Sequence, residues 1–379
     1  MSVKPKIIVS VTNDLATDQR VNRTCHALIA QGFEVVLVGR ATANSPQLLE
    51  RDYSCIRFRL WFNKGPLFYA NYNICLFFFI LFSNAKALFS NDLDTLPANF
   101  IVSKLRGLIL VYDSHEYYTG VPELEQRPGV RKVWETIEGW IFPSLNQIIT
   151  VNESIAGLYE KKYNKKLIVI RNVPSKYNKN GESIDKIALR LKIGLPTDKK
   201  ILILQGAGIN VERGAEEAVE AMQYLNNVQL VILGGGDVMH NLKIRTTQLH
   251  LEEKIIFKPR MPYEEMMQYT AACDIGLTLD KDTNLNYRFS LPNKVFDYIQ
   301  AGIPILASRL PEVEKIIGGY QVGLFIENHN PHHIAEKIKE MLNSEENLVR
   351  WQKNLQSASL ELAWEVEQKK FPNFINELH

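Results

Sequence analysis

Residues 201–214 read ILILQGAGINVERG, and this stretch indicates how the second half of the chain folds. The apolar run at 201–204 predicts a buried strand, because a strand of a parallel sheet is covered on both faces. Gly206 and Gly208 permit a tight turn with a close backbone approach, and helix-compatible residues follow Gly214. A strand, a glycine loop and a helix in succession form a βα unit, whose helix N-terminus can bind an anion such as phosphate.

The same alternation of apolar runs and longer amphipathic stretches extends over the whole chain. It predicts an α/β protein with two parallel sheets, each covered by helices on both faces. The expected strands lie at residues 7–11, 33–38, 56–60, 87–90, 108–112, 147–151, 167–170, 201–204, 228–233, 255–258, 275–279, 305–307 and 323–326. The expected helices lie at residues 18–31, 94–105, 130–141, 154–163, 216–224, 238–249, 263–272, 293–300 and 331–342.

These elements divide into two Rossmann-like domains in tandem. The first is expected at residues 1–175 and the second at 199–354, with a polar linker at 176–198. A helical tail at about 355–379 contains apolar side chains that a free tail would not expose, so it is expected to pack back on the first domain. In doubly wound folds ligands bind beyond the carboxyl ends of the strands, which predicts an active site between the domains.

The composition is that of an ordinary globular protein. Hydrophobic residues make up 46% and charged residues 23% of the 379 residues, which excludes collagen-like and mostly disordered chains. The net charge of +2 predicts no polyanionic partner. Residues 1–180 nevertheless hold 22 Lys and Arg against 15 Asp and Glu, whereas residues 181–379 hold 22 against 27. The basic first half and the acidic second half are expected to face different partners.

Features of the chain point to a reducing compartment. The four cysteines show no paired spacing, so neither a disulfide framework nor a zinc site is indicated. The N-terminal residues lack the apolar stretch of a secretory signal, and the most apolar segment, residues 74–82, is too short to span a bilayer. A cytoplasmic protein is therefore expected.

The loop at 206–214 favours a phosphate ligand. It is not a dinucleotide fingerprint, because Val211 stands where the third glycine would be. Arg213 strengthens the phosphate hypothesis, since a guanidinium can bind two phosphate oxygens at once. A tight βα turn would explain the glycines equally well, and the same two alternatives hold for Gly235 in the glycine run 234–236.

Residues 290–304, SLPNKVFDYIQAGIP, are the most informative stretch for function. Pro292 predicts a helix start, and Lys294 then lies in the first turn, where the helix dipole disfavours a positive charge. A bound anion would resolve this conflict, which capping alone explains poorly. Asp297, one turn later, could accept hydrogen bonds from a ribose or sugar diol.

His115 follows the apolar run 108–111 at the end of a predicted strand. A neutral imidazole could donate a hydrogen bond to a substrate hydroxyl, whereas a protonated one could stabilise developing charge. An ordinary pKa near ~6.5 leaves both states open. A histidine that only caps the loop is the alternative without a catalytic role.

Two Asp-x-Asp pairs have the spacing of divalent-metal ligands, Asp92 with Asp94 and Asp280 with Asp282. A helix N-cap explains Asp94 more simply. No metal is expected at either pair.

Several ordered motifs resemble glycosyltransferase family 4, whose members have the GT-B fold. These motifs are the loop 206–214 with its basic residue before the last glycine, LGGG at 233–236, IIFKPRMPYEE at 255–265, ACDIGL at 272–277 and DYIQAGIPILAS at 297–308. The resemblance covers nearly the whole chain and is most specific in the second half. DQRV at 18–21 and GFEV at 32–35 are weaker counterparts in the first half.

This resemblance implies transfer of a sugar from a nucleotide-diphosphate sugar to a glycan or lipid-linked acceptor. It implies retention of the anomeric configuration and a role in bacterial surface polysaccharide or glycolipid synthesis. The nucleotide would bind to the C-terminal domain and the acceptor to the N-terminal one. Backbone groups at 260–262 would read the base, Asp297 matches the acid expected on the donor ribose, and His115 matches the histidine near the transferred sugar.

The implied site residues fall into three groups. The catalytic residues are His115, Arg213 and Lys294, the last two of which would neutralise the diphosphate leaving group. The donor-binding residues are Gly206, Gly208, Arg213, Gly235, Arg260, Pro262, Pro292, Asn293, Lys294 and Asp297. The residues on the acceptor side are Asp18, Arg20 and Glu116. No cofactor is expected, because the family usually needs no metal and the nucleotide-sugar is a substrate.

The chain departs from the family pattern at two positions. Phe289 stands where the first acid of the family's paired-acid motif would be, eight positions before Asp297. Ala207 stands where many members have an arginine in the phosphate loop. Neutralisation of the diphosphate would therefore depend more heavily on Arg213 and Lys294.

Other classes of function fit less well. A retaining glycosidase needs two carboxylates about 5–5.5 Å apart, and the sequence suggests no such pair. A nucleic-acid partner is not expected, because the basic residues are not clustered with stacking aromatics. The alternatives that stay open are a GT-B-fold nucleotide-sugar epimerase, with the same donor site and no acceptor, and a non-catalytic nucleotide-sugar-binding protein.

Residues 68–82 allow two interpretations. Phe68, Tyr69, Tyr72 and the apolar run 76–82, within the basic first half, suggest a peripheral contact with the anionic inner face of the cytoplasmic membrane. A helix buried in the core explains the same pattern.

Overall fold

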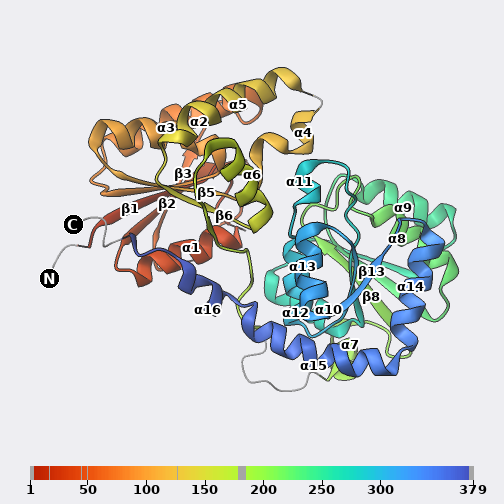
Figure 1. The fold of residues 1–379 in the computed structure, drawn as a ribbon. Helices are drawn as coiled ribbons and strands as arrows, with labels where there is room; N and C mark the ends of the chain where they lie inside the picture. The colour runs from red at the N-terminus through yellow and green to blue at the C-terminus, as the bar shows by residue number, and fades with distance from the viewer. Residues whose placement is uncertain are drawn as a thin grey trace. The chain divides into compact units, whose positions relative to one another are not determined.

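The computed structural model describes residues 4–16, 18–43, 45–48, 50–125, 127–177 and 185–374. The chain divides into two compact units. Unit 1 comprises Met1–Arg171 and Gln368–His379, and unit 2 comprises Asn172–Glu367. Each unit contains a parallel β-sheet with helices packed against it (Figure 1). The predicted α/β class is therefore confirmed.

In the described part of unit 1, seven parallel strands form a sheet in the order β3-β2-β1-β4-β5-β6-β7. The strands are β1 (Lys6–Ser10), β2 (Glu34–Ala41), β3 (Ser54–Arg59), β4 (Ala87–Asn91), β5 (Ile109–Ser114), β6 (Gln147–Thr150) and β7 (Ile168–Val169). The central strands β1 and β4 are almost wholly buried, as expected of strands covered on both faces.

The helices of unit 1 form two layers. They are α1 (Gln19–Ala30), α2 (Gly65–Leu81), α3 (Asp92–Arg106), α4 (Pro122–Glu125), α5 (Pro128–Ile141) and α6 (Glu153–Tyr163), with 3-10 turns η1 (Tyr118–Gly120) and η2 (Phe142–Ser144). Helices α2, α3 and α5 lie on one side of the sheet and α1 lies on the other (Figure 1).

Residues 68–82, for which the sequence allows a membrane contact or a core helix, lie mostly in helix α2. Phe68, Tyr72, Leu76 and Ile80 are buried in the core between α2, α3 and the sheet. One face of α2 is thus buried in the core, as the second interpretation predicts. Within the described ranges, no helix has both the length and the apolar character needed to cross a membrane.

In the described part of unit 2, six parallel strands form a sheet in the order β10-β9-β8-β11-β12-β13. The strands are β8 (Lys200–Gly206), β9 (Val228–Gly234), β10 (Ile255–Lys258), β11 (Ile275–Thr278), β12 (Ile305–Ser308) and β13 (Gly323–Ile326). The helices are α7 (Lys186–Ile193), α8 (Ala215–Ala221), α9 (Met239–Gln248), α10 (Tyr263–Ala272), α11 (Leu285–Arg288), α12 (Asn293–Gln300), α13 (Pro311–Tyr320), α14 (Pro331–Asn343), α15 (Glu345–Glu361) and α16 (Trp364–Glu367), with the 3-10 turn η3 (Met222–Tyr224).

The end of the chain differs from the single helical tail expected at 355–379. Helix α15 packs on α12, α13 and α14 within unit 2, and the chain joins unit 1 only from Gln368, where the 3-10 turn η4 (Gln368–Lys370) begins. There Phe371 stacks on Phe89 at 6.1 Å and Gln31 donates a hydrogen bond to the carbonyl of Pro372. Residues 375–379, and residues 178–184 of the expected linker, lie outside the described ranges.

Candidate functional site

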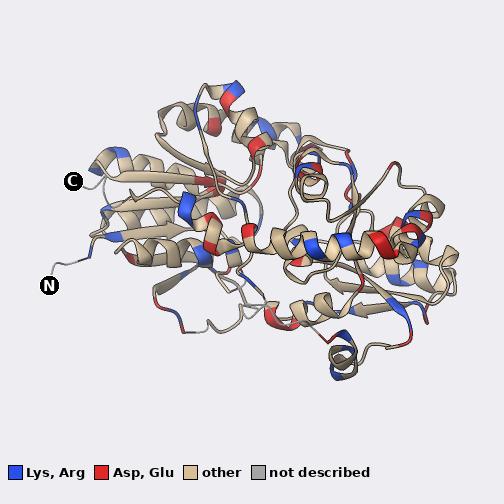
Figure 2. Cartoon of the chain, turned by 60° about the horizontal axis from the view of Figure 1, so that its bottom comes forward, with Lys and Arg blue, Asp and Glu red and all other residues tan. Residues whose placement is uncertain are grey.

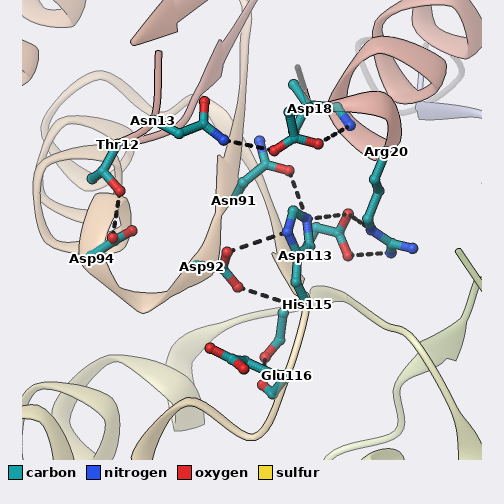
Figure 3. A network of polar contacts seen from close by, with 12 residues as sticks. Thr12, Asn13, Asp18, Arg20, Asn91, Asp92, Asp94, Asp113, His115 and Glu116 are labelled. Atoms are coloured by element: carbon teal, nitrogen blue, oxygen red, sulfur yellow. Dashed lines mark hydrogen bonds and ion pairs between the residues drawn. The ribbon is translucent and has the colours of Figure 1, made fainter. Parts of the chain in front are cut away.

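Polar side chains of unit 1 gather where β4 and β5 end. These strands are neighbours, and Asn91 at the end of β4 lies opposite Asp113 near the end of β5. Asp92 and His115 follow at the same edge, and Arg20 reaches it from the first turn of α1 (Figure 3). We call Arg20, Asp92, Asp113 and His115 the unit 1 cluster.

Arg20 and Asp113 form a buried bidentate ion pair. Nε of Arg20 donates to Oδ2 of Asp113 at 3.0 Å, Nη2 donates to Oδ1 at 2.7 Å, and Nη1 donates to the carbonyl of Ile170 at 2.8 Å. Burial alone would raise the pKa of Asp113, but Arg20 and His115 outweigh it and hold that pKa well below its usual range. Each guanidinium nitrogen already donates within unit 1, so Arg20 fixes the orientation of Asp113.

His115 lies between two carboxylates. Its Nδ1 is 3.2 Å from Oδ2 of Asp92, and its Nε2 is 3.3 Å from Oδ2 of Asp113 and 3.2 Å from Oδ1 of Asn91. Burial alone would lower the pKa of His115, but Asp92 and Asp113 together outweigh it and raise the pKa to about 9. Of the two protonation states that the sequence left open, the structure favours the imidazolium at neutral pH.

The prediction that Asp94 is a helix N-cap is wrong. Helix α3 begins at Asp92 with Asn91 as its N-cap residue, so Asp94 lies inside the first turn. Its Oδ2 instead accepts a hydrogen bond from Oγ1 of Thr12 at 2.6 Å. Burial first, and then the charge of Asp92, raise the pKa of Asp94 to about 7. The buried environment, and not a cap, determines the behaviour of this carboxyl.

The two Asp-x-Asp pairs are engaged with protein groups. Oδ1 of Asp92 accepts a hydrogen bond from the backbone N–H of His115 at 2.9 Å. Asp282 lies 3.9 Å from Nη1 of Arg288. Across the part of the chain that the structure describes, no group of three His, Cys, Asp or Glu side chains is placed to hold a metal ion.

Asp18 and Glu116 flank the unit 1 cluster (Figure 3). Asp18 caps α1, because its Oδ1 accepts a hydrogen bond from the backbone N–H of Val21 at 3.0 Å, and its Oδ2 accepts one from Asn13 at 2.7 Å. The carbonyl of Glu116 accepts a hydrogen bond from Oγ of Ser114 at 2.7 Å, which fixes the turn after β5. Both acidic side chains are half-buried.

The second group of charges lies in unit 2, after β11. Asp280 is 1% exposed, and its Oδ1 lies 3.4 Å from Nη1 of Arg213. The guanidinium of Arg213 stacks 4.6 Å from the ring centroid of Tyr287. Nε of Arg213 and Oδ2 of Asp280 are buried with no hydrogen-bond partner among the described residues. We call Arg213, Asp280 and Lys294 the unit 2 cluster.

Lys294 lies in the first turn of α12, where the sequence predicts it, and Pro292 is the N-cap residue. Burial, and to a smaller extent Arg213, lower the pKa of Lys294, although Asp280 opposes the shift. Within the described ranges Lys294 makes no hydrogen bond or ion pair. Pro292 offers no side-chain cap, and Asn293 opens the helix, so the first N–H groups of α12 are available to a ligand or water.

Asp297 is held one turn further along α12, with 7% of its surface exposed. Its Oδ2 accepts a hydrogen bond from Nε2 of Gln205 at 3.1 Å, and its Oδ1 accepts one from Oη of Tyr263 at 2.9 Å. Gln205 is itself oriented by Thr270, which donates to Oε1 at 2.6 Å. These contacts fix the carboxylate beside the end of β8.

The glycine loops of unit 2 touch each other backbone to backbone. Gly234 has φ of 133°, and a Cβ there would lie 1.9 Å from the carbonyl oxygen of Gly206. Arg260 donates to the carbonyl of Ala207 and packs over Gly235, where a Cβ would lie 2.8 Å from its Nε. Close packing alone therefore requires glycine at 234, which leaves the phosphate role of these loops to be tested.

A pocket of about 310 Å³ opens beside these loops, at the ends of β9 and β10. Its lining residues are Gly234, Gly235, Gly236, Met239, Lys243, Phe257, Lys258 and Pro259. Gly208 lies in the loop after β8, and Pro262 is the N-cap residue of α10, which follows β10. The predicted donor-binding residues thus end or follow β8, follow β9 and β10, or lie at the start and in the first turns of α12.

Several residues that complete the clusters were missed by sequence reasoning. Asp113 carried a signal, since a carboxylate at the end of an apolar strand needs a partner when it is buried. Tyr263, Tyr287 and Gln205 carried no such signal, because tyrosine and glutamine occur in many roles at strand ends and helix starts.

The solved structures that resemble the chain define its class of fold. A sucrose-phosphate synthase from Thermosynechococcus elongatus matches with a TM-score of 0.80 at 17% identity, over 99% of both chains. Alr3699/HepE of Anabaena, in complex with UDP-glucose, matches with a TM-score of 0.74 at 15% identity, over 98% of this chain and 99% of that one. The chain has the GT-B fold, as expected.

Sequence comparison adds the family. Residues 185–358, within unit 2, match the family model described as glycosyl transferases group 1, which confirms the expected likeness to GT-B glycosyltransferases. A curated relative, the D-inositol 3-phosphate glycosyltransferase of Corynebacterium glutamicum (strain R), is 21% identical over 199 residues. The match covers 50% of this chain and 46% of the relative, so the chain spans about half the length of that relative.

Proposed function

We propose that the protein transfers a sugar from a nucleotide-diphosphate sugar to a glycan or lipid-linked acceptor, with retention of the anomeric configuration. The unit 2 cluster carries the proposal. Its one carboxylate, Asp280, pairs with Arg213 and leaves Lys294 without an ion pair in the described structure, and Nε of Arg213 is buried without a partner there. A buried unpaired donor and an excess of positive charge are both costly, and a diphosphate would relieve both.

In the proposed reaction, the bond between the anomeric carbon and the diphosphate oxygen breaks, and negative charge develops on the diphosphate. Arg213 would bind two phosphate oxygens, Lys294 would add a point charge, and the first N–H groups of α12 would donate to the same anion. Because the charge grows as the bond breaks, these contacts stabilise the transition state more than the bound donor.

The nucleoside is proposed to bind beside the cluster. Asp297 would accept hydrogen bonds from the ribose, with Tyr263 and Gln205 holding its carboxylate in place. The pocket at the ends of β9 and β10 has a volume of about 310 Å³ and would accept the base. Arg260, whose side chain lies over Gly235 of the pocket lining, and Pro262 would read the base through their backbone groups.

The acceptor is assigned to unit 1. His115, charged at neutral pH, would contact the transferred sugar, and Asp18 and Glu116 would contact acceptor hydroxyls. Arg20 would act indirectly, since its guanidinium nitrogens all donate within unit 1 and its role is to orient Asp113 and, through it, His115.

No metal is proposed to take part, because Arg213 and Lys294 already supply two positive charges where a metal would neutralise the diphosphate. Activity that persists in a chelator is expected, and activity abolished by the chelator and restored by a divalent cation would overturn this part of the proposal.

The proposal is tested by screening UDP-, GDP-, ADP- and CMP-sugars, first for protection against thermal unfolding and then for turnover with candidate acceptors. A ligand at about 100 times its Kd adds roughly 2.7 kcal/mol of stability, which is readily measured. We expect one donor class to protect, and its nucleotide to be released only when an acceptor is present. Conversion of the donor without acceptor would indicate an epimerase, and binding without any conversion would indicate a non-catalytic binding protein.

The cellular role that we propose is the synthesis of bacterial surface polysaccharide or glycolipid at the inner face of the cytoplasmic membrane. The implied acceptor class supports it, because lipid-linked acceptors are held at a membrane surface.

A further inference from the structure

One face of helix α2 in unit 1 exposes several large apolar side chains. On α2 and at its C-cap, Leu67, Ile74, Phe78 and Phe82 are 58%, 57%, 53% and 81% exposed. Their spacing of seven, four and four residues places them on one face of the helix, opposite the face that enters the core. The preceding loop adds two more exposed apolar residues. The full set, which we call the α2 stripe, is Trp61, Phe62, Leu67, Ile74, Phe78 and Phe82.

Two rings of the α2 stripe pack on each other. The rings of Phe78 and Phe82 stack at 6.4 Å with an interplanar angle of 10°, while both remain more than half exposed. Trp61 is 89% exposed. Single exposed apolar residues are ordinary on protein surfaces, but several on one face of a helix indicate an interaction site.

The stretch of sequence that contains the α2 stripe is basic. Residues 53–91 contain four Lys and Arg and no Asp or Glu, and α2 itself has no charged residue. Exposed Lys64 precedes α2 and exposed Lys86 follows it, while Lys104 lies in the last turn of α3, which packs on α2. Figure 2 shows long stretches of unit 1 without either charge colour. The apolar side chains of the α2 stripe are thus flanked by Lys64, Lys86 and Lys104, which we call the cationic rim.

We propose that the α2 stripe docks on the surface of an anionic lipid bilayer. Helix α2 would lie in the plane of the interface, with the aromatic and aliphatic side chains among the acyl chains and the flanking lysines on lipid phosphates. Helix α2 does not cross the bilayer in this proposal, since it is 17 residues long and buries its other face in the core.

The charge pattern favours a bilayer over a second copy of the chain. In a two-fold symmetric dimer the same patch meets itself. Lys64 and Lys86 would then face the same segment of the second copy, residues 53–91, which contains no Asp or Glu to pair with them. Lipid phosphates supply the missing negative charge. The inference does not depend on the proposed transfer reaction, because binding to vesicles requires no donor.

The first experiment measures flotation of the full chain with vesicles of phosphatidylglycerol mixed with phosphatidylcholine, and with phosphatidylcholine alone. We expect binding to the anionic vesicles that weakens at high salt, and little binding to the neutral ones. The double variant Phe78→Ser with Phe82→Ser should reduce the bound fraction about tenfold, because two buried rings are lost from the interface. The matched control is Val349→Ser with Leu360→Ser on α15 of unit 2, which are 70% and 55% exposed and should bind as wild type.

The second experiment tests the cationic rim. Lys64→Glu with Lys86→Glu should weaken binding to anionic vesicles and remove most of its salt dependence. Lys192→Glu with Lys353→Glu, on exposed positions of unit 2, changes the net charge equally and should have a much smaller effect. Thermal unfolding of each variant in the absence of vesicles checks that the fold is intact.

Three results would overturn the inference. The wild type could fail to float with anionic vesicles at low salt. The Phe78→Ser/Phe82→Ser variant could bind as wild type does while melting normally. Sedimentation could show a dimer that this variant dissociates, with no vesicle binding, which would make the stripe an interface between copies of the chain. Failure of the proposed transfer reaction would leave all three measurements interpretable.

Discussion

The two charged clusters differ in how fully their charges are paired. In the unit 1 cluster, each guanidinium nitrogen of Arg20 has an acceptor, and both ring nitrogens of His115 lie within 3.3 Å of a carboxylate or amide oxygen. In the unit 2 cluster, Nε of Arg213 lacks a partner in the described structure, and Lys294 has neither a hydrogen bond nor an ion pair there.

This difference separates a cluster that is complete in itself from one that needs a ligand. Two cations and two carboxylates balance in unit 1, so its side chains are fixed before any substrate arrives. In unit 2 there are two cations and a single carboxylate, which pairs with Arg213 only, so an incoming dianion finds positive charge that is already desolvated. Unit 1 should therefore respond to mutation through stability, and unit 2 through ligand binding and turnover.

The largest effect is expected for Arg20→Ala. Removal of the guanidinium leaves the Asp113 carboxylate buried without its partner, which should cost unit 1 about 3–5 kcal/mol of unfolding free energy. Urea unfolding, with hydrogen exchange of the β5 amides as the local readout, measures it. The double variant Arg20→Met with Asp113→Leu should recover most of the loss, because apolar replacements of both partners leave no buried charge. Equal destabilisation in the double variant would show that the ion pair is not the source.

Arg213→Ala and Lys294→Met are expected to lower turnover and to leave the stability of the ligand-free protein largely unchanged. Each should lower turnover about 10²–10³-fold, as loss of a donor to developing charge does. Lys294→Met should not destabilise the ligand-free protein, since burial already disfavours its charge and lowers its pKa. Arg245→Ala, a paired surface cation on α9, is the control. Unchanged turnover in both cluster variants would remove the diphosphate assignment.

The stability lost in His115→Gln should depend on pH, because His115 is charged in the folded wild type. The pKa of His115 rises from about 6.5 in the unfolded chain to about 9 in the folded one, so the folded protein binds this proton more tightly. The stability that this contributes is fully present below about pH 6.5 and is lost as the pH rises through about 9. The stability difference between wild type and variant should therefore shrink by about 1–3 kcal/mol across that range. A difference that stays constant from pH 6 to 10 would contradict a protonated His115.

Asp94→Asn should show a second pH-dependent difference in stability. Burial raises the pKa of Asp94 from 3.8 to about 7, so its proton stabilises the folded state below about pH 4, and this contribution is lost as the pH rises to about 7. The variant should accordingly gain on wild type by about 2–4 kcal/mol over that interval, with Thr12 donating to the new amide oxygen. Asp198→Asn on the exposed surface is the control. A gain that is the same at pH 4 and pH 7 would contradict the raised pKa.

The sequence predicts unit 2 more completely than unit 1, for a physical reason. The conflict between Lys294 and the helix dipole is local, so it can be read from residues 290–297 alone. Arg20 and Asp113 are 93 positions apart, and only the strand order of the sheet brings them together. Pairing over such a separation leaves no pattern in a single sequence.

Other differences have similar causes. The predicted start of α3, residue 94, is two residues too late. The helix begins at Asp92 with φ of 57°, a conformation that no local sequence pattern predicts. The two faces of α2 could not be told apart from the sequence, because the helix is apolar all round and only the packing decides which side is buried.

The most direct test of the central claim is calorimetric titration of the wild type, Lys294→Met and Arg20→Lys with nucleoside diphosphates and the matching monophosphates. The account predicts that one diphosphate binds more tightly than its monophosphate, and that Lys294→Met removes this preference while Arg20→Lys retains it. If no diphosphate is preferred by the wild type, or if Lys294→Met retains the preference, the unit 2 cluster is not a diphosphate site.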